Sequence, residues 1–289
     1  MRRKRFIQFS ALILLAAGVL LCWPRGPKEP VFEGRKLGYW IRQSLASVDP
    51  QHEEQAERAV KTAGTNALPY LLDQFTQPQS RWVRILNRTG TKFHTSLHLE
   101  TEGERISVAL FGLSALGRDA APALPVLATQ LGNPDPQRRL GATVVMIDCG
   151  DKALPFLRNA IASTNSYIVC AALVGLDGLL AGTNDSALPL VVSLLSHSSS
   201  EVRRRAFAAL GNSRASPAIT TQELMPALGV KNLEVQLAAM DLLGKLGPAA
   251  KPAVPALLKL MTHSNAHLAR AASNAVLHID PSALPPRQP

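Results

Sequence analysis

Two marks recur along most of this chain, and their spacing restricts the fold more than any other feature. One is a small residue in mid-helix, at Ala59, Ala109, Ala142, Ala172, Ala206, Ala239 and Ala272. The other is a proline near the start of the next apolar run, at Pro69, Pro125, Pro155, Pro189, Pro226, Pro255 and Pro285. From Ala109 onward the alanine intervals are 33, 30, 34, 33 and 33 residues. A period near 33 residues predicts stacked two-helix units, because one such unit cannot bury its own apolar faces.

Residues 233–261 show one unit in full. Apolar residues recur at three- and four-residue spacing over residues 235–246, which predicts an amphipathic helix. Gly247 tolerates a left-handed helix end and Pro248 cannot continue the hydrogen-bond ladder, so the helix should stop there. A second apolar run follows with Pro255 in its first turn, where the missing N–H costs little. Aromatic residues make up only 5% of the chain, which suits close-packed short helices built from Ala and Leu.

These units resemble the HEAT repeat in its short bacterial form, related to PBS-lyase-like repeats. Residues 201–211 (EVRRRAFAALG) and 234–239 (EVQLAA) are similar to the family's second helix, and residues 253–258 (AVPALL) to its first helix. Tetratricopeptide and ankyrin repeats have a similar period, but their characteristic residues are missing. The resemblance covers roughly residues 50–280 and departs from the family at Gln236, where an arginine is usual.

The resemblance implies an all-α fold, an α-solenoid of about six to seven two-helix repeats in a right-handed superhelix. It places the second helices on the concave face and the prolines on the convex side. HEAT proteins as a class are scaffolds and binding surfaces, and some relatives modify pigments or nucleic acids.

The first residues of the chain predict that it is targeted to a membrane. Arg2, Arg3, Lys4 and Arg5 precede an uncharged run over residues 6–23. In a helix this run would span roughly 27 Å, close to the hydrocarbon thickness of a bilayer. The basic residues should stay in the cytoplasm. We therefore expect residues 1–23 to be a signal anchor, with the repeats periplasmic or extracellular.

Two alternatives stay open for this segment. A cleaved signal peptide would release the repeats as a secreted protein, although no A-x-A cleavage site follows the run. Lipidation at Cys22 is the other, although residues 19–21 lack the small residue that a lipobox has before its cysteine.

The rest of the chain divides by composition and rhythm. Residues 24–36 are rich in Pro and Gly and are expected to form an extended spacer. Residues 37–48 should form a helix that caps the array, with Trp40, Ile41 and Leu45 on one side. The α-solenoid is expected over residues 37–282, and a Pro-rich tail over residues 283–289.

An insertion at residues 76–103 interrupts the repeats between the first two units. Arg81, Arg84 and Arg88 could share one helical face, with Trp82 on the opposite side. One interpretation is a basic amphipathic helix that touches a membrane surface or a partner. The other is a lid in which Trp82 packs on the first repeat while the arginines stay solvated.

Basic residues within the array give a second set of candidates. The densest clusters are Arg138-Arg139 and residues 203–205. If they point into the concave groove, they could bind an acidic partner or a phosphate backbone. The alternative is structural, because family arginines at the position of Arg203 commonly pair with an acidic residue of the neighbouring unit. The candidate partner-binding residues are Arg81, Trp82, Arg84, Arg88, Arg139 and Arg204.

The net charge of +10 does not indicate nucleic-acid binding, because residues 1–49 carry six of the ten excess charges. His94 and His98 have metal-ligand spacing without a convincing third ligand, so no metal is expected. His197, His263 and His267 lie at unit junctions, where solvated helix ends are expected.

Cys149 and Cys170 should be separate small core residues, because about nine residues of helical offset is too far for a disulfide. No enzyme motif is present and no cofactor is expected.

The sequence thus favours a non-catalytic, membrane-tethered scaffold that presents a concave groove to another protein. One alternative is an accessory subunit of an enzyme, lyase-like or chaperone-like. Nucleic-acid binding is weaker, and no small-molecule substrate is evident.

Overall fold

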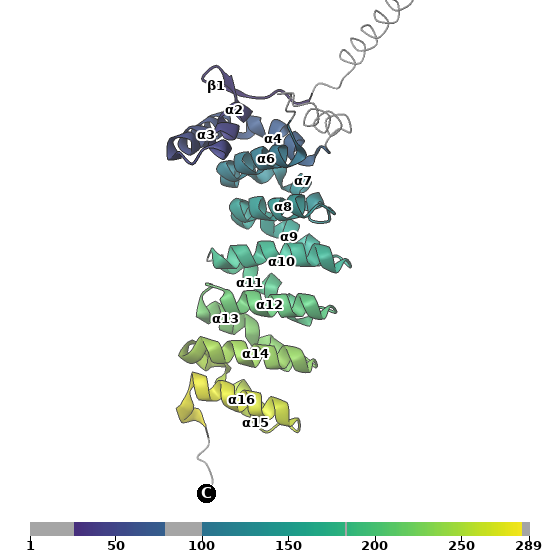
Figure 1. Cartoon of the computed structure of the whole chain (residues 1–289). Helices are drawn as coiled ribbons and strands as arrows, with labels where there is room; N and C mark the ends of the chain where they lie inside the picture. Colours follow the sequence, from purple (N-terminus) through teal and green to yellow (C-terminus); the bar gives the residue numbers. More distant parts are fainter. Residues whose placement is uncertain (1–25, 79–99, 183, 285–289) are drawn as a thin grey trace, which may run out of the picture. The chain divides into compact units, whose positions relative to one another are not determined.

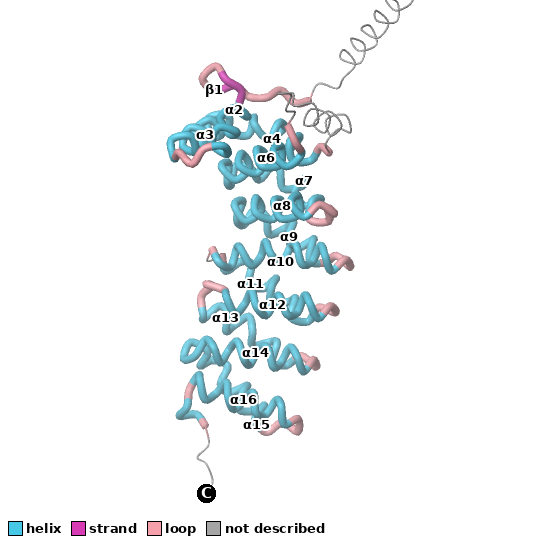
Figure 2. Tube along the Cα trace, viewed as in Figure 1, coloured by secondary structure: helices cyan, strands magenta, loops and turns pink. Residues whose placement is uncertain are grey.

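The computed structural model describes residues 26–78, 100–182 and 184–284, and most of these residues are helical (Figures 1 and 2). Pairs of helices repeat along the chain, so the predicted all-α repeat architecture is confirmed. The chain divides into two compact units, with the boundary between Gly112 and Leu113 inside helix α6 (Glu102–Leu116). Each unit is described by itself.

Unit 1 begins with a short hairpin and continues as helices. Strands β1 (Val31–Phe32) and β2 (Arg35–Lys36) pair antiparallel, so the expected extended spacer folds back on itself at its end. Helices α2 (Leu37–Ala46), α3 (Pro50–Ala63) and α4 (Leu68–Thr76) follow, and then α6 begins. The indole N–H of Trp40 donates to the Phe32 carbonyl at 3.1 Å, which ties the hairpin to α2.

The predicted apolar side of α2 is wrong at one residue. Leu37, Ile41 and Ser44 form its buried side against α3, whereas Leu45 is 49% exposed. Residues 37, 41 and 44 follow the helical period closely, and residue 45 lies 100° further around the helix axis than residue 44. The capping role of this helix stays a prediction.

Unit 2 is a two-layer stack of alternating long and short helices (Figure 1). The long helices are α8 (Pro136–Cys149), α10 (Ser166–Ala181), α12 (Ser200–Asn212), α14 (Leu233–Leu246) and α16 (Ala266–Ile279). The short helices are α7 (Leu124–Gln130), α9 (Leu154–Ile161), α11 (Leu188–Ser193), α13 (Pro217–Leu224) and α15 (Val254–Met261). Successive long helices contact one another, and the short helices lie behind them in Figure 1.

The seven recurring alanines all lie in long helices: α3, α6, α8, α10, α12, α14 and α16. Each of them has no exposed surface. A methyl side chain allows the backbones of neighbouring helices to approach closely, which explains why this position stays small. The predicted repeat mark is therefore confirmed as the centre of the buried side of each long helix.

Local signals set the ends of the long helices. An Asp or Asn side chain accepts a backbone N–H at the start of α3, α8, α10, α14 and α16. A glycine with positive φ follows α3, α6, α8 and α14, and Gly247, predicted to end α14, has φ 58°. The turn after it is a 3-10 helix (Gly247–Ala253) rather than a bare tight turn.

The predicted prolines are second residues of short helices in five units, at Pro69, Pro125, Pro155, Pro189 and Pro255. Pro226 departs from this pattern. The helix of its unit, α13, begins at Pro217, and Pro226 lies in the 3-10 helix (Met225–Gly229) that follows it. Both prolines fit a first helical turn, and the earlier one starts the helix. Pro285 lies outside the described residues.

Helices α8 and α10 pack closely because α10 carries glycines at the contact. A Cβ on Gly178 would overlap the side chain of Ile147 and lie 2.8 Å from its Cγ1. A Cβ on Gly175 would lie 3.1 Å from Leu157 Cδ2, on α9. These positions need the smallest residue for a steric reason, not for backbone conformation.

Two predicted segments lie outside the described residues: the anchor at residues 6–23 and most of the insertion, residues 79–99. In residues 26–78, 100–182 and 184–284, no helix has the length and apolar character needed to cross a bilayer.

Candidate functional site

Each long helix of unit 2 has a side turned away from its buried alanine. On an ideal helix, residues two before and two after the alanine lie about 160° from it, on the opposite side. We call this surface the outward face. These two positions hold Leu140 and Val144 on α8, Cys170 and Val174 on α10, Arg204 and Ala208 on α12, Leu237 and Asp241 on α14, and Arg270 and Asn274 on α16. All ten residues are exposed or half-buried, so the fold does not need their side chains as core.

Large apolar side chains gather on the outward face of α8 and α10. Leu140 is 59% exposed, Val144 41% and Val174 38%. Tyr167, one turn before Cys170, lies on the same side of α10 and is 79% exposed. Isolated exposed apolar residues are ordinary, but a cluster on neighbouring helices marks a contact surface.

Sequence reasoning missed this cluster because its residues fall between the stripe positions that predict the core. The sequence signal that could have predicted the cluster is an apolar residue two positions before or after the central alanine.

The outward face is hollowed between α12 and α14. Half-buried Phe207 and buried Val235 line this hollow, and Arg203, Arg204 and Glu234 are among its polar lining. The Arg203 guanidinium donates to Glu234 of the next unit, with Nε 2.9 Å from Oε2. The same side chain donates to the carbonyls of residues 197 and 198, each at 2.9 Å. The predicted pairing of Arg203 with an acidic residue of the neighbouring unit is confirmed.

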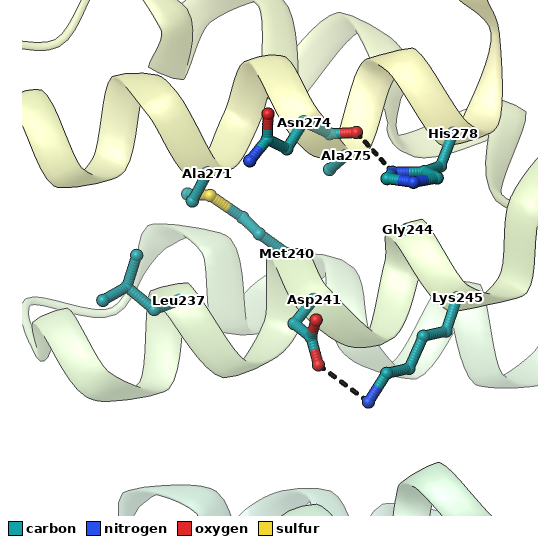
Figure 3. Close-up of a pocket in the computed structure, with 9 residues that line it drawn as sticks. All are labelled: Leu237, Met240, Asp241, Gly244, Lys245, Ala271, Asn274, Ala275 and His278. Carbon is teal, nitrogen blue, oxygen red and sulfur yellow. Dashed lines mark hydrogen bonds and ion pairs between the residues drawn. The ribbon is translucent and has the colours of Figure 1, made fainter.

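A second hollow lies between α14 and α16 (Figure 3). Met240 lies between the two helices, where Gly244 and Ala271 leave space because they lack long side chains. An ion pair between Asp241 and Lys245, 2.9 Å long, forms one polar rim. On the other side the His278 ring lies 2.8 Å from the Asn274 carbonyl. The hollow therefore combines an apolar floor with polar rims, an arrangement that suits a side chain of a partner.

The structure separates the predicted site residues into three groups. Arg204 is on the outward face with its side chain 68% exposed, and it donates to Glu201 at 3.0 Å. Arg139 is half-buried and donates to the carbonyls of Asn133 and Pro134 at 2.7 and 3.2 Å, so it braces the turn before α8. Arg81, Trp82, Arg84 and Arg88 lie outside the described residues.

Arg138 occupies a position where other long helices bury an apolar side chain. Val202, Val235 and Leu268 stand four residues before their alanines, and Arg138 does so on α8. Its side chain is 5% exposed, and its Nε lies 3.5 Å from Asp135 Oδ2. The long apolar stem of arginine can fill such a position while the guanidinium keeps a charged partner.

The two described cysteines differ in burial. Cys149 is 1% exposed and donates its S–H to the Gly117 carbonyl at 3.6 Å, as expected for a core residue. Cys170 is half-buried on the outward face, so its prediction as a core residue is wrong. It stands two residues before Ala172, which turns it away from the buried side. Burial raises the pKa of Cys149 to about 11, and burial also raises the pKa of Cys170.

Of the three histidines predicted at unit junctions, His197 and His263 hold turns together, and His267 is exposed in the first turn of α16. His197 accepts the Ser199 backbone N–H and His263 accepts that of Asn265, each at 3.0 Å. His94 and His98 lie outside the described residues. Within the described ranges, no three His, Cys, Asp or Glu side chains gather closely enough to hold a metal ion.

Unit 1 contains a polar cluster that sequence reasoning did not foresee. Glu29 accepts the Gly38 backbone N–H at the start of α2 at 2.8 Å. Tyr70 is 5% exposed, and burial, reinforced by the charge of Glu29, raises its pKa well above the usual value. Arg42 donates to Glu100 at 2.8 Å. Glu29 and Arg42 are thus used in contacts within unit 1, which support its N-terminal segment.

The comparisons with known proteins address the repeats. Residues 188–278 match the family described as HEAT repeats, and this range covers α11 to α15 and nearly all of α16, with both hollows. No curated protein matches the sequence.

Among solved structures, the chain is similar to an engineered protein, with 18% identity and a TM-score of 0.34, over 84% of this chain and 95% of the other. It is also similar to a designed armadillo repeat protein in complex with the peptide (KR)4, with 16% identity and a TM-score of 0.34, over 85% of this chain and 100% of the other.

A third similar structure is the karyopherin Kap121p bound to the SUMO protease Ulp1p, with 16% identity and a TM-score of 0.36 over 84% of this chain. The match spans only 28% of that karyopherin. The family match covers residues 188–278, about a third of the chain, so the predicted resemblance to HEAT repeats is supported over that range.

Proposed function

We propose that this chain is a non-catalytic protein-binding scaffold, and that the outward face of the long helices in unit 2 holds the partner. The observation that carries the proposal is the exposed apolar cluster of Leu140, Val144, Tyr167 and Val174 on two neighbouring helices. A folded protein in water gains nothing from exposing such a cluster unless another molecule covers it.

The chemistry of the outward face supports binding rather than catalysis. Its charged residues are largely used in local ion pairs, such as Asp241 with Lys245. Its one thiol, Cys170, has a pKa raised by burial, which lowers the thiolate fraction that a nucleophile needs. Hollows with apolar floors and polar rims, one repeat apart, suit successive side chains of a bound protein.

Photo-crosslinking in cells tests the proposal. A photoreactive amino acid replaces Val144 or Ala208 on the outward face, and Asn159 on α9 in the matched control, where it is exposed on the layer of short helices. We expect a protein adduct of defined mass from the first two positions and none from the control. Equal adducts from all three positions, or none from any, would overturn the proposal.

We further propose that residues 6–23 tether the scaffold to a membrane and that the repeats lie on the non-cytoplasmic side. The support is the run of 18 uncharged residues after four basic ones. Membrane fractions should retain the chain after a high-salt wash, and protease added to spheroplasts should digest the repeats. Full protection of the repeats in intact spheroplasts would contradict this topology.

A further inference from the structure

The outward face changes its chemistry along the stack of long helices. On α8 and α10 it is apolar, with Leu140, Val144 and Val174 all more than a third exposed. On α12, α14 and α16 the equivalent positions include Arg204, Asp241 and Arg270. One continuous surface thus offers an apolar half and a charged half in a fixed order.

The charged half has more cations than carboxylates. The Glu201 carboxylate pairs with two arginines at once. Arg204 Nη2 lies 2.8 Å from Glu201 Oε2, and Arg205 Nε lies 2.6 Å from Glu201 Oε1. These hydrogen bonds, led by the one from Arg205, hold the pKa of Glu201 below its usual range, so the carboxylate stays ionised and neutralises only one of the two cations. Arg203 and Glu234 neutralise each other.

The end of the stack adds a further cation. Asp241 and Lys245 form a balanced pair, whereas exposed Arg270 on α16 forms no ion pair with any described residue. Two positive charges are therefore in excess on this half of the outward face. A carboxylate of a partner can meet them without displacing an existing carboxylate.

The hollows lie within the charged half. Phe207 and Val235 line the first, and Met240 lies at the floor of the second (Figure 3). A bound segment can therefore place apolar side chains in the hollows while its acidic side chains meet the arginines on the rims. Neither a purely acidic chain nor a purely apolar chain would use both features.

We infer that the outward face binds an acidic amphipathic protein segment, with large apolar side chains over α8 and α10 and carboxylates toward Arg204, Arg205 and Arg270. This inference rests on the proposed scaffold function and adds the chemistry and direction of the partner. From α8 to α16 is four helix spacings, about 36 Å, which a helix covers in about 24 residues and an extended chain in about 11.

Selection from a random peptide display library against the full chain tests the inference. Enriched peptides should have a net negative charge and large apolar residues at one end. The variant R204E/R270E should bind them at least tenfold more weakly. The matched control is R158E/K259E, which reverses two exposed cations on the short helices α9 and α15 and should leave affinity unchanged.

A second variant tests the apolar half. V144D/V174D should also weaken the enriched peptides at least tenfold, and truncating the apolar end of the peptide should remove the difference between this variant and the parent chain. All substituted residues are exposed, so thermal unfolding should stay within a degree or two of the parent chain and loss of binding can be read as loss of contact.

The outcomes separate the inference from the proposed function. The enriched peptides could instead be neutral or basic and still crosslink to a photoreactive residue at position 144 or 208. That result would overturn the inference and leave the scaffold function standing. No enrichment, or equal weakening by R158E/K259E, would overturn the inference as well. Crosslinks confined to the short helices would overturn both.

Discussion

Ala206 and Ala208 stand two residues apart on α12 and are chemically identical, yet the first has no exposed surface and the second is exposed. The first is one of the seven alanines that mark the repeat, and the second lies on the outward face. The same contrast holds on every long helix of unit 2. The buried side repeats from helix to helix because each helix packs against the next, whereas the outward side is free to differ, and it does.

The difference between the buried side and the outward face indicates which residues can determine binding specificity. Packing fixes the alanine, the apolar residues beside it and the braced turn before the helix. Nothing in the fold requires Leu140 on α8 or Arg204 on α12, since each is exposed. Residues that carry function in such a stack should therefore lie at positions where the residue type does not repeat from unit to unit.

The largest expected effect comes from enlarging the buried alanine. Ala206→Leu adds three carbons to a fully packed site, so it should lower the free energy of unfolding by about 1–3 kcal/mol. Ala208→Leu, the matched change on the outward face, should alter it by less than about 0.5 kcal/mol. Urea denaturation followed by circular dichroism measures both, and equal losses would break the distinction between the two sides.

Next in size is the contrast between two neighbouring arginines. Arg203 donates hydrogen bonds to two carbonyls and pairs with Glu234, and the Arg203 side chain is 19% exposed. The Arg204 side chain is 68% exposed. Arg203→Ala should cost about 1–2 kcal/mol of unfolding free energy, and Arg204→Ala less than about 0.5. Glu234→Gln keeps the braced turn and should cost less than Arg203→Ala; if it costs as much, the ion pair and not the turn is the stabilising contact.

A smaller effect separates two helical glycines. Gly178→Ala forces its methyl group into the Ile147 side chain and should cost about 1 kcal/mol despite the better helix propensity of alanine. Gly211→Ala on α12 meets only Leu242 Cδ2 at 3.8 Å, so the propensity gain should remain, up to about 0.5 kcal/mol. The predicted signs are opposite, and two changes of the same sign in thermal unfolding would contradict the packing argument.

The last contrast concerns the reactivity of two cysteines and not the stability of the fold. Cys149 lies on the buried side with a pKa of about 11, and Cys170 lies on the outward face. At pH 8 iodoacetamide should label Cys170 much faster, because Cys149 has a small thiolate fraction and little access. Raising the pH toward 10 should speed the labelling of Cys149, since its thiolate fraction rises with pH below its pKa. Peptide mapping by mass spectrometry follows both sites, and faster labelling of Cys149 at pH 8 would refute their assignment.

Local rules were sufficient for much of the fold. The alanine spacing, the Asp and Asn caps and Gly247 each act within a few residues, so the long helices and the end of α14 were predictable. Pro226 was misassigned because two prolines nine residues apart both fit a helix start. The choice of Pro217 depends on packing across the stack, which a local pattern does not contain.

The candidate site was less predictable for the same reason. Arg204 and Arg139 look alike in sequence, each in a basic pair or triplet at the start of a long helix. Only the fold shows that Arg139 turns back to two carbonyls while Arg204 faces outward, because a difference of one helical position is 100° of rotation.

The sequence by itself determined the period, the helix pairs and the buried stripe, since these depend on residue spacing along one chain. Tertiary structure decided which side chains remain free after the helices have stacked. It brought Leu140, Val144, Tyr167 and Val174 together from two helices and opened the hollows over Phe207 and Met240. The physical reason is that exposure is settled by neighbours distant in sequence, and only packing supplies those neighbours.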